Sequence, residues 1–153
     1  MSEDEFLSSW LRCFRRCGAD VAATDNPRLL SGCCRLRPGN EVYQTKIRVQ
    51  DGFVTIYIQA PYPSVDKQAC LELVSYINYR LYKGHFNVDA RDGEIVFKFM
   101  LPLSSFDGED SPFYRELVML PVAMINKFEP SFKMLSEGRG VEESFKNCRG
   151  GWE

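Results

Sequence analysis

Apolar and polar residues alternate along this chain with two periods, one helical and one typical of strands. Near the N-terminus the helical period predicts a helix over residues 3–18, closed by Gly18. Its apolar positions are Phe6, Leu7, Trp10, Leu11 and Phe14. The next stretch is less regular, but between its turn signals Ser31–Arg37 is expected to form a short edge strand.

Residues 41–60 alternate with the period of a strand and predict a β-hairpin. The turn falls at Asp51-Gly52, a pair typical of a two-residue type I′ turn. Pairing the strands about this turn gives one apolar face and one mixed face. The apolar pairs are Val49 with Val54, Ile47 with Ile56, Thr45 with Ile58 and Tyr43 with Ala60. The mixed pairs are Gln50 with Phe53, Arg48 with Thr55, Lys46 with Tyr57 and Gln44 with Gln59.

A second hairpin is predicted about Asp92-Gly93, with Arg91 facing Glu94 as a cross-strand ion pair. Its apolar pairs are Ala90 with Ile95, Val88 with Phe97 and Phe86 with Phe99. Its mixed pairs are Asp89 with Val96, Asn87 with Lys98 and His85 with Met100. Two hairpins with the same sidedness predict an antiparallel sheet that helices cover on one face.

Two further helices are expected. The first has Ser64 as its N-cap and ends before Gly84. Its apolar stripe is Val65, Ala69, Leu73, Ile77 and Leu81. The second opens at Ser111-Pro112, is kinked or broken at Pro121, and meets a boundary at Glu129-Pro130.

Together these elements predict an α+β fold in the order α-β-β(-β)-α-β-β-α. Its antiparallel sheet of about five strands packs against helices. We expect a single domain over residues 1–138. The glycine-rich, polar residues 139–153 are expected to form a flexible tail.

Composition excludes several classes of function. With a net charge of -2 and a pI near 5.5, the chain lacks the basic field of a nonspecific nucleic-acid binder. No apolar run approaches the roughly 18–20 residues that span a bilayer. The start, MSEDEF, is acidic where a secretory signal is basic and then apolar, so we expect a cytoplasmic protein. Its 6 cysteines are then expected to be reduced thiols.

The chemistry-bearing residues do not form an active-site pattern. Cys13 and Cys17 lie one helical turn apart and Cys33-Cys34 are adjacent, but no CxxC pair supports a zinc site. No glycine-rich phosphate loop occurs. We therefore expect no catalytic, cofactor-binding or metal-binding residues. The alternatives are an enzyme or small-ligand-binding domain that uses His85 and neighbouring acids, and a metal or redox sensor that uses the cysteines.

The mixed sheet face is the main candidate for function. Its predicted protein-binding residues are Phe53, Tyr57, Val96, Met100, Lys46, Arg48 and Lys98. Apolar groups among cations suit a dimer interface or an acidic peptide segment of a protein partner. Scattered exposed apolar groups, which are ordinary on protein surfaces, are the alternative interpretation.

The run YINYRLYKGHFNVDARDGEIVFKFMLPL resembles the signature of the YbjN family, a group assigned to bacterial sensory transduction. The matching residues are Asn78, Gly84, Phe86, Asp92, Gly93 and Ile95–Leu101. The later MINKFEPSFKMLSEG, with Pro130 and Gly138, resembles the closing segment of that family, so the likeness covers roughly residues 40–138.

The YbjN family is similar in fold to type III secretion chaperones. Those are small, acidic, cytoplasmic α+β homodimers that hold an extended partner segment. The resemblance implies a non-enzymatic regulator or chaperone-like module that binds other proteins, without a cofactor, and forms a homodimer.

Overall fold

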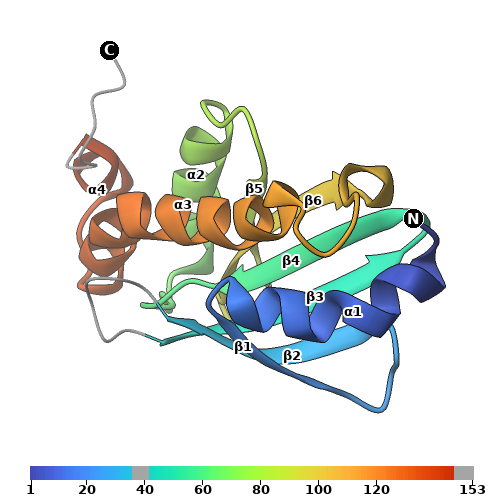
Figure 1. The fold of residues 1–153 in the computed structure, drawn as a ribbon. Helices are drawn as coiled ribbons and strands as arrows, with labels where there is room; N and C mark the ends of the chain where they lie inside the picture. Colours follow the sequence, from blue (N-terminus) through green and yellow to red (C-terminus); the bar gives the residue numbers. More distant parts are fainter. Residues whose placement is uncertain (36–41, 147–153) are drawn as a thin grey trace. The chain divides into compact units, whose positions relative to one another are not determined.

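The protein is described here by a computed structural model that covers residues 1–35 and 42–146 (Figure 1). Its elements are α1 (Glu3–Arg16), β1 (Ala19–Ala23), β2 (Leu29–Arg35), β3 (Val42–Gln50), β4 (Phe53–Gln59), α2 (Lys67–Asn78), β5 (His85–Val88), β6 (Ile95–Pro102), the 3-10 turn η1 (Leu103–Ser105), α3 (Pro112–Ser136) and α4 (Val141–Lys146). The strands form a six-stranded antiparallel sheet in the order β1-β2-β3-β4-β6-β5. The predicted α+β class and antiparallel sheet are confirmed.

The sixth strand is β1, which the pattern of residues did not reveal. Because β1 pairs with β2, the strand expected at Ser31–Arg37 lies inside the sheet and starts at Leu29. It is therefore not an edge strand, and that prediction was wrong. The pattern missed β1 because it has only five residues, three of them alanine, and no strong alternation.

The contacts of the chain group into two compact units. Unit 1 comprises Met1–Ile58 and Phe99–Val122, and unit 2 comprises Gln59–Lys98 and Ala123–Glu153. The expected division into a domain at 1–138 and a tail at 139–153 stays a prediction. Within the described part of that tail, however, residues Val141–Lys146 form helix α4. No helix in the described ranges is long and apolar enough to cross a membrane.

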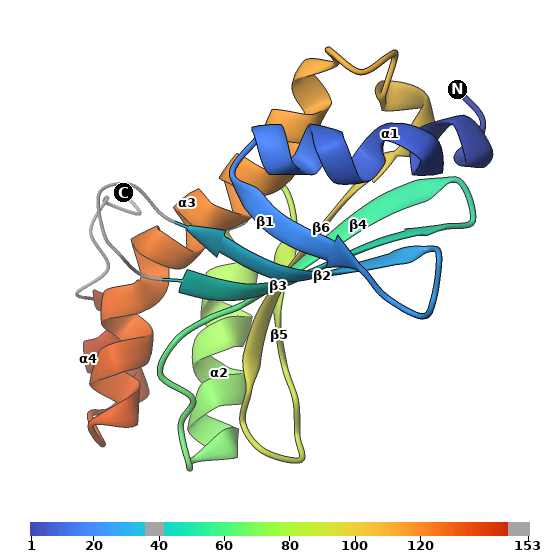
Figure 2. The same ribbon diagram turned by 60° about the horizontal axis from the view of Figure 1, so that its bottom comes forward.

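In unit 1, helix α1 packs against the strands as predicted (Figure 2). Ser2 is its N-cap, and the side chains of Ser2 and Glu5 form a reciprocal capping box. The apolar face buries Phe6, Trp10 and Phe14 completely or nearly so. These rings meet aromatic side chains from later in the chain. The ring of Phe6 lies 5.7 Å from that of Tyr114 and 5.2 Å from that of Phe106.

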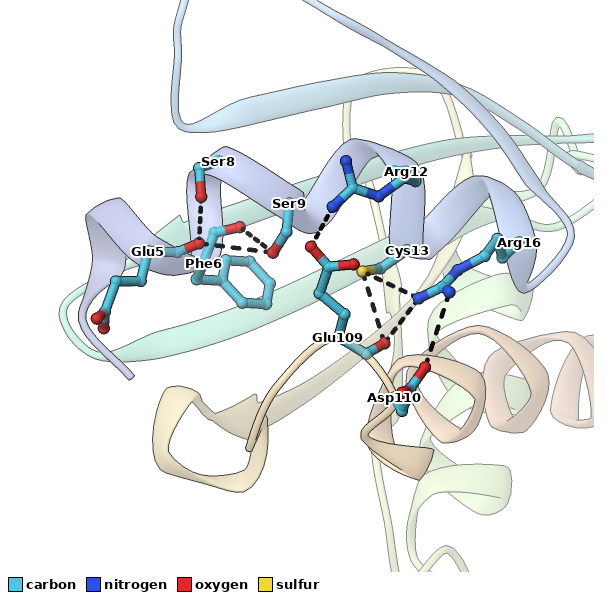
Figure 3. A network of polar contacts seen from close by, with 9 residues as sticks. All are labelled: Glu5, Phe6, Ser8, Ser9, Arg12, Cys13, Arg16, Glu109 and Asp110. Atoms are coloured by element: carbon cyan, nitrogen blue, oxygen red, sulfur yellow. Dashed lines mark hydrogen bonds and ion pairs between the residues drawn. The ribbon is translucent and has the colours of Figure 1, made fainter.

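A polar network also fastens α1 to the segment before α3 (Figure 3). Arg12 forms an ion pair with the carboxylate of Glu109. Arg16 donates to the backbone carbonyl of Glu109 over 2.8 Å and lies 3.7 Å from the carboxylate of Asp110. The thiol of Cys13 donates to the same carbonyl over 3.7 Å. Because these groups are partly exposed, the network orients the segment and adds little stability.

The first predicted hairpin is confirmed in turn and register. Asp51 and Gly52 have φ angles of 52° and 76°, as a type I′ turn requires. Val49 pairs with Val54, and every other pair of this ladder matches the prediction from Thr45–Ile58 to Gln50–Phe53. The carboxylate of Glu3 accepts a hydrogen bond from the backbone N–H of Gly52 over 3.2 Å, so α1 also holds the turn.

In unit 2, helix α2 begins later than predicted. Its N-cap is Asp66, whose carboxylate accepts from the N–H of Ala69 over 3.0 Å, and not Ser64. Val65 therefore lies outside the helix and is 99% exposed rather than part of an apolar stripe. Leu73 and Ile77 are buried as predicted, together with Cys70 and Val74.

The end of α2 was also predicted too late. The side-chain amide of Asn78 donates to the carbonyl of Phe86 over 2.8 Å and accepts from the N–H of Phe86 over 2.8 Å. These two hydrogen bonds to β5 hold the chain at Asn78, and the helix does not continue for a further turn. Leu81 consequently lies beyond the helix and is half-buried.

The second hairpin has a different turn and register from those predicted. His85 pairs with Lys98 rather than Met100, and Phe86 pairs with Phe97 rather than Phe99. A shift of two residues keeps each side chain on its predicted face, so the sidedness survives the error. The loop runs over residues 89–94, and Arg91 forms its ion pair with Asp89 instead of Glu94.

Tertiary packing explains this difference. Only Gly93 of the Asp92-Gly93 pair has a positive φ, so the turn is not type I′. A Cβ at Gly93 would lie 2.3 Å from the carbonyl oxygen of Ser64. The glycine is therefore required because the loop packs closely against the segment before α2.

Helix α3 runs without interruption from Pro112 to Ser136, so the helix is not broken at Pro121 and the boundary predicted at Glu129-Pro130 was wrong. A kink at Pro121, the other form of that prediction, stays a prediction. A proline within a helix costs about 3 kcal/mol through its missing hydrogen bond and its ring. Burying one large apolar side chain contributes about 1.5–3 kcal/mol. Helix α3 buries more large apolar side chains than it contains prolines, so their burial offsets the free-energy cost of the prolines. The buried side chains are Tyr114, Leu117, Val118, Val122, Ile125, Phe128, Phe132 and Leu135.

Gly32 on β2 offers a test of the β1–β2 pairing. A Cβ at this position would lie 2.1 Å from the carbonyl oxygen of Asp20 and 2.8 Å from the Cα of Val21. We expect Gly32→Ala to lower the free energy of unfolding by about 1–3 kcal/mol, because only backbone can give way. Gly140→Ala, which meets nothing within 4 Å, should change it by less than about 0.5 kcal/mol. Denaturant unfolding measures both, and equal stability of the two variants would contradict the close approach.

The hydroxyl of Tyr114 offers a second test. It is buried in the aromatic cluster and has no hydrogen-bond partner among the described residues. Burial raises the pKa of this phenol to about 12, so it stays neutral. Because an unpaired buried hydroxyl costs free energy, Tyr114→Phe should leave thermal stability unchanged or raise it. Tyr114→Leu keeps an apolar group but loses the ring contacts, and we expect it to melt at a lower temperature. A clear loss of stability in Tyr114→Phe would show that the hydroxyl has a partner.

Candidate protein-binding face

The alternation of β3 places its outward side chains on one open face of unit 1. Every second residue from Val42 to Gln50 is exposed, and the residues between them are buried. Lys46 and Arg48 are both exposed positions of this row. Neither has an ion-pair partner within the ranges 1–35 and 42–146, so two cations face outward from a sheet whose other face is packed.

Strand β4 sets aromatic side chains beside these cations. Tyr57 pairs with Lys46, and Phe53 pairs with Gln50 at the turn. Phe53 is 42% exposed and Tyr57 is half-buried. Met100, on the part of β6 that belongs to unit 1, is also 42% exposed. Unit 1 thus carries five of the seven residues predicted for this face, all of them accessible.

The row continues across β2 to the edge strand with smaller groups. Ser31 pairs with Lys46 on one side and with Ala22 on the other, and Leu29 pairs with Arg48. Sequence reasoning did not include these residues, because it left β1 out and put β2 at the edge. Leu29 and Ser31 are half-buried and Ala22 is exposed, so the row continues beside the cations without a charged side chain.

The other two predicted residues, Val96 and Lys98, belong to unit 2. Both are half-buried on β6, where Val96 pairs with Asn87 and Lys98 with His85. Their sidedness agrees with the prediction. The grouping of all seven residues into a single binding face stays a prediction.

His85 does not have the surroundings that the enzyme hypothesis requires. It is exposed, on the edge strand β5, and its cross-strand neighbour is the cation Lys98. The acid that the hypothesis would use, Asp89, is held by Arg91 through side-chain bonds of 2.7–3.2 Å. These hydrogen bonds lower the pKa of Asp89 to about 2, so its carboxylate is already engaged as an anion.

One cysteine, Cys33, lies beside this face: it is half-buried and pairs with Gln44 of β3. Cys13, Cys34 and Cys70 are buried and unpaired. Burial raises the pKa of Cys34 to about 11, which keeps the thiol protonated and unreactive. Among the described residues no group of three His, Cys, Asp or Glu side chains is placed to hold a metal ion. Cys148 lies outside the described residues.

Comparison with known proteins identifies a shared fold but does not identify a family. No protein-family model matches the sequence, and no curated protein matches it. A chain of the HopA1–SchA chaperone–effector complex is similar in structure, with a TM-score of 0.55 and 7% identity, over 84% of this chain and 98% of that one. A chain of the ExsC–ExsE complex gives a TM-score of 0.53 and 9% identity, over 97% of both chains.

YbjN from E. coli, a candidate transcription regulator, gives a TM-score of 0.51 and 13% identity, over 86% of this chain and 92% of that one. The protein therefore has the α+β fold of type III secretion chaperones. In particular it shares that fold with YbjN, as the resemblance in sequence implied. At these identities the likeness concerns the fold alone.

The surroundings of His85 can be tested by titration. Partial desolvation, with the nearby ammonium of Lys98 as a further cause, lowers the pKa of His85 from 6.5. As the only histidine, it gives the only imidazole C–H signals in a proton NMR titration, and we expect their midpoint below pH 6.5. Lys98→Gln should move the midpoint upward, and Lys98→Arg should not.

The sign of the accompanying stability change follows from the same shift. Because the folded protein binds this proton less readily than the unfolded chain does, stability should decrease as the pH falls through 6.5. A midpoint at or above 6.5 would show instead that an anion faces the imidazole.

Proposed function

We propose that this protein is a non-enzymatic, cytoplasmic, chaperone-like module that binds a segment of another protein on its open sheet face. In this proposal it acts as a homodimer. The observation that carries the proposal is the outer face of β3 and β4, where the exposed Phe53 and the half-buried Tyr57 lie on the strand next to Lys46 and Arg48, two cations without an ion-pair partner in the described part of the chain. We call Lys46, Arg48, Phe53, Tyr57 and Met100 the open face.

The geometry of the open face suits an extended ligand. Residues two apart on a strand lie about 6.6–6.8 Å apart. An extended segment that runs along β3 repeats with the same spacing, so alternate side chains can meet Lys46 and Arg48 in turn. The segment requires no helix or deep pocket for this contact.

The charge of the open face favours an acidic segment. No carboxylate occurs at the outward positions of β3 and β4. These positions are Val42, Gln44, Lys46, Arg48 and Gln50 on β3, and Phe53, Thr55 and Tyr57 on the part of β4 in unit 1, of which Thr55 is buried. The chain as a whole has a net charge of -2, so the face is locally positive on an acidic protein. Such a contrast steers an acidic partner to this face and away from the rest of the surface.

The fold comparison supports a protein as the partner. Two of the structural neighbours are chains of complexes, and one of these is a chaperone–effector complex. Val96 and Lys98 of unit 2 complete the proposed binding residues, since they have the same combination of apolar and cationic character.

Site-specific photocrosslinking tests the proposal. A benzoylphenylalanine at position 53 should crosslink, in cells of the protein's own source, to one discrete protein whose linked peptide is acidic. The matched control places the same group at Met119, which is 45% exposed in α3 of unit 1, against 42% for Phe53. A crosslinked product of twice the chain's mass at position 53 would place the homodimer interface on the same face.

Charge reversal then links the crosslink to the cations. Lys46→Glu with Arg48→Glu should reduce the crosslink by at least about tenfold, because like charges then oppose an acidic segment. Lys46→Arg with Arg48→Lys preserves the charge and should preserve the crosslink. Equal crosslinking from positions 53 and 119, or a yield unaffected by charge reversal, would contradict the proposal.

A further inference from the structure

The two cations of the open face lie on one strand, two residues apart. Lys46 and Arg48 are exposed outward positions of β3, and neither has an ion-pair partner within residues 1–35 and 42–146. Residues two apart on a strand are separated by about 6.6–6.8 Å, so the two positive charges repel each other. A ligand that brings two carboxylates at the same spacing relieves this repulsion at both positions.

The strands on either side place no carboxylate directly opposite these cations. The four side chains that pair with Lys46 and Arg48 across the sheet are all uncharged. They are Leu29 and Ser31 on β2, and Thr55 and Tyr57 on β4. The sheet therefore leaves the neutralisation of both charges to a bound segment.

Uncharged polar residues bound the pair of cations along β3. Gln50 lies on the side of the turn and Gln44 on the other side, and both are exposed. A further acidic residue at the same spacing would meet an amide instead of a cation. On the row of Gln44, Cys33 joins β3 to the edge strand, which carries the exposed carboxylate of Asp20 there. The open face thus matches two acidic residues and not a longer acidic run.

An apolar contact lies at the end of the row nearest the turn. Phe53 pairs with Gln50 and is 42% exposed. Met100, on the strand next to β4, is exposed to the same extent. Gln50 is two residues from Arg48, so a segment whose acidic residue meets Arg48 has its next face-directed side chain beside Phe53. An apolar side chain gains burial there, whereas a carboxylate would lose hydration without meeting a cation.

We infer that the open face recognises one pattern in an extended segment. The pattern is an apolar residue followed by two acidic residues, each two positions from the next. The apolar side chain meets Phe53, the middle residue meets Arg48 and the last meets Lys46. Both chain directions satisfy the pattern, because an extended chain alternates its side chains in either direction. The inference rests on the proposed function and deepens it, since it assigns the sequence class of the bound segment.

Three peptides of identical composition and with blocked termini test the pattern. SFSESES has the inferred order. SSFSEES keeps the phenylalanine two positions from one glutamate but turns the second glutamate to the opposite side of the extended chain. FSSESES keeps both glutamates in step and turns the phenylalanine to the opposite side. Each is titrated against the isotope-labelled full chain, and binding is followed by the NMR signals of the amides on β3 and β4.

The peptide with the inferred order should bind more tightly than both isomers. We expect a preference of about two- to fivefold over SSFSEES, the range of one exposed ion pair. Over FSSESES we expect at least about twofold, because that isomer buries no apolar surface against Phe53.

Single variants assign each preference to one side chain. Lys46→Gln should abolish the preference over SSFSEES, which already lacks a carboxylate opposite Lys46. Phe53→Ser should abolish the preference over FSSESES. The matched controls are Arg115→Gln and Met119→Ser, at exposed residues of α3 in unit 1, and both preferences should persist in them.

The inference is overturned if the three peptides bind equally, if none binds at millimolar concentration, or if a variant of the open face behaves like its control on α3. Equal binding that is still lost in Lys46→Glu with Arg48→Glu would overturn the pattern and leave the acidic segment of the proposed function in place. Crosslinking at position 53 in cells decides the proposed function separately, because it uses none of these peptides.

Discussion

The hairpin of β3 and β4 is the constraint on which the rest of unit 1 depends. Asp51 and Gly52 both adopt a left-handed conformation, and only this kind of turn joins adjacent strands by two residues without splaying them. The turn sets which residues face each other, and the period of a strand then decides which side each one takes. A slip by one residue would bury Lys46 and Arg48 and expose Ile47 and Val49. The pairing register of β3 and β4 thus determines both which residues form the core and which form the open face.

This dependence explains why the sidedness of β3 and β4 was predictable from sequence. Four residues of the open face, Lys46, Arg48, Phe53 and Tyr57, lie on the two strands that this turn joins, and their alternation fixes the side of each. Met100 comes from β6, and the role of the face in binding stays a prediction. The second hairpin shows the limit of the same reasoning. Its Asp-Gly pair looks equivalent, but Gly93 meets the carbonyl of Ser64, a contact between segments that the sequence does not reveal. The turn therefore differs from the predicted one, and the pairing of β5 with β6 is shifted by two residues. Each side chain still lies on its predicted face only because the shift is an even number of residues.

Other errors have the same origin in long-range contacts. Helix α2 ends where Asn78 bonds the backbone of Phe86, and this amide pairing has no signature in the periodicity of the helix. A proline on its own predicts a local break in a helix. Helix α3 nevertheless continues through Pro121, because the burial of the apolar side chains around it stabilises the helix by more than the proline destabilises it. Helix α4 escaped prediction for a further reason. The polar, glycine-rich sequence there forms a helix because Phe145 has an aromatic and cationic site to enter.

The proposed binding face has a fixed conformation. The open face is built on paired strands, whose hydrogen bonds and buried inner face hold its side chains in one arrangement. A segment that binds there would meet a surface that requires no ordering before contact, so the entropy cost of association would fall mainly on the partner.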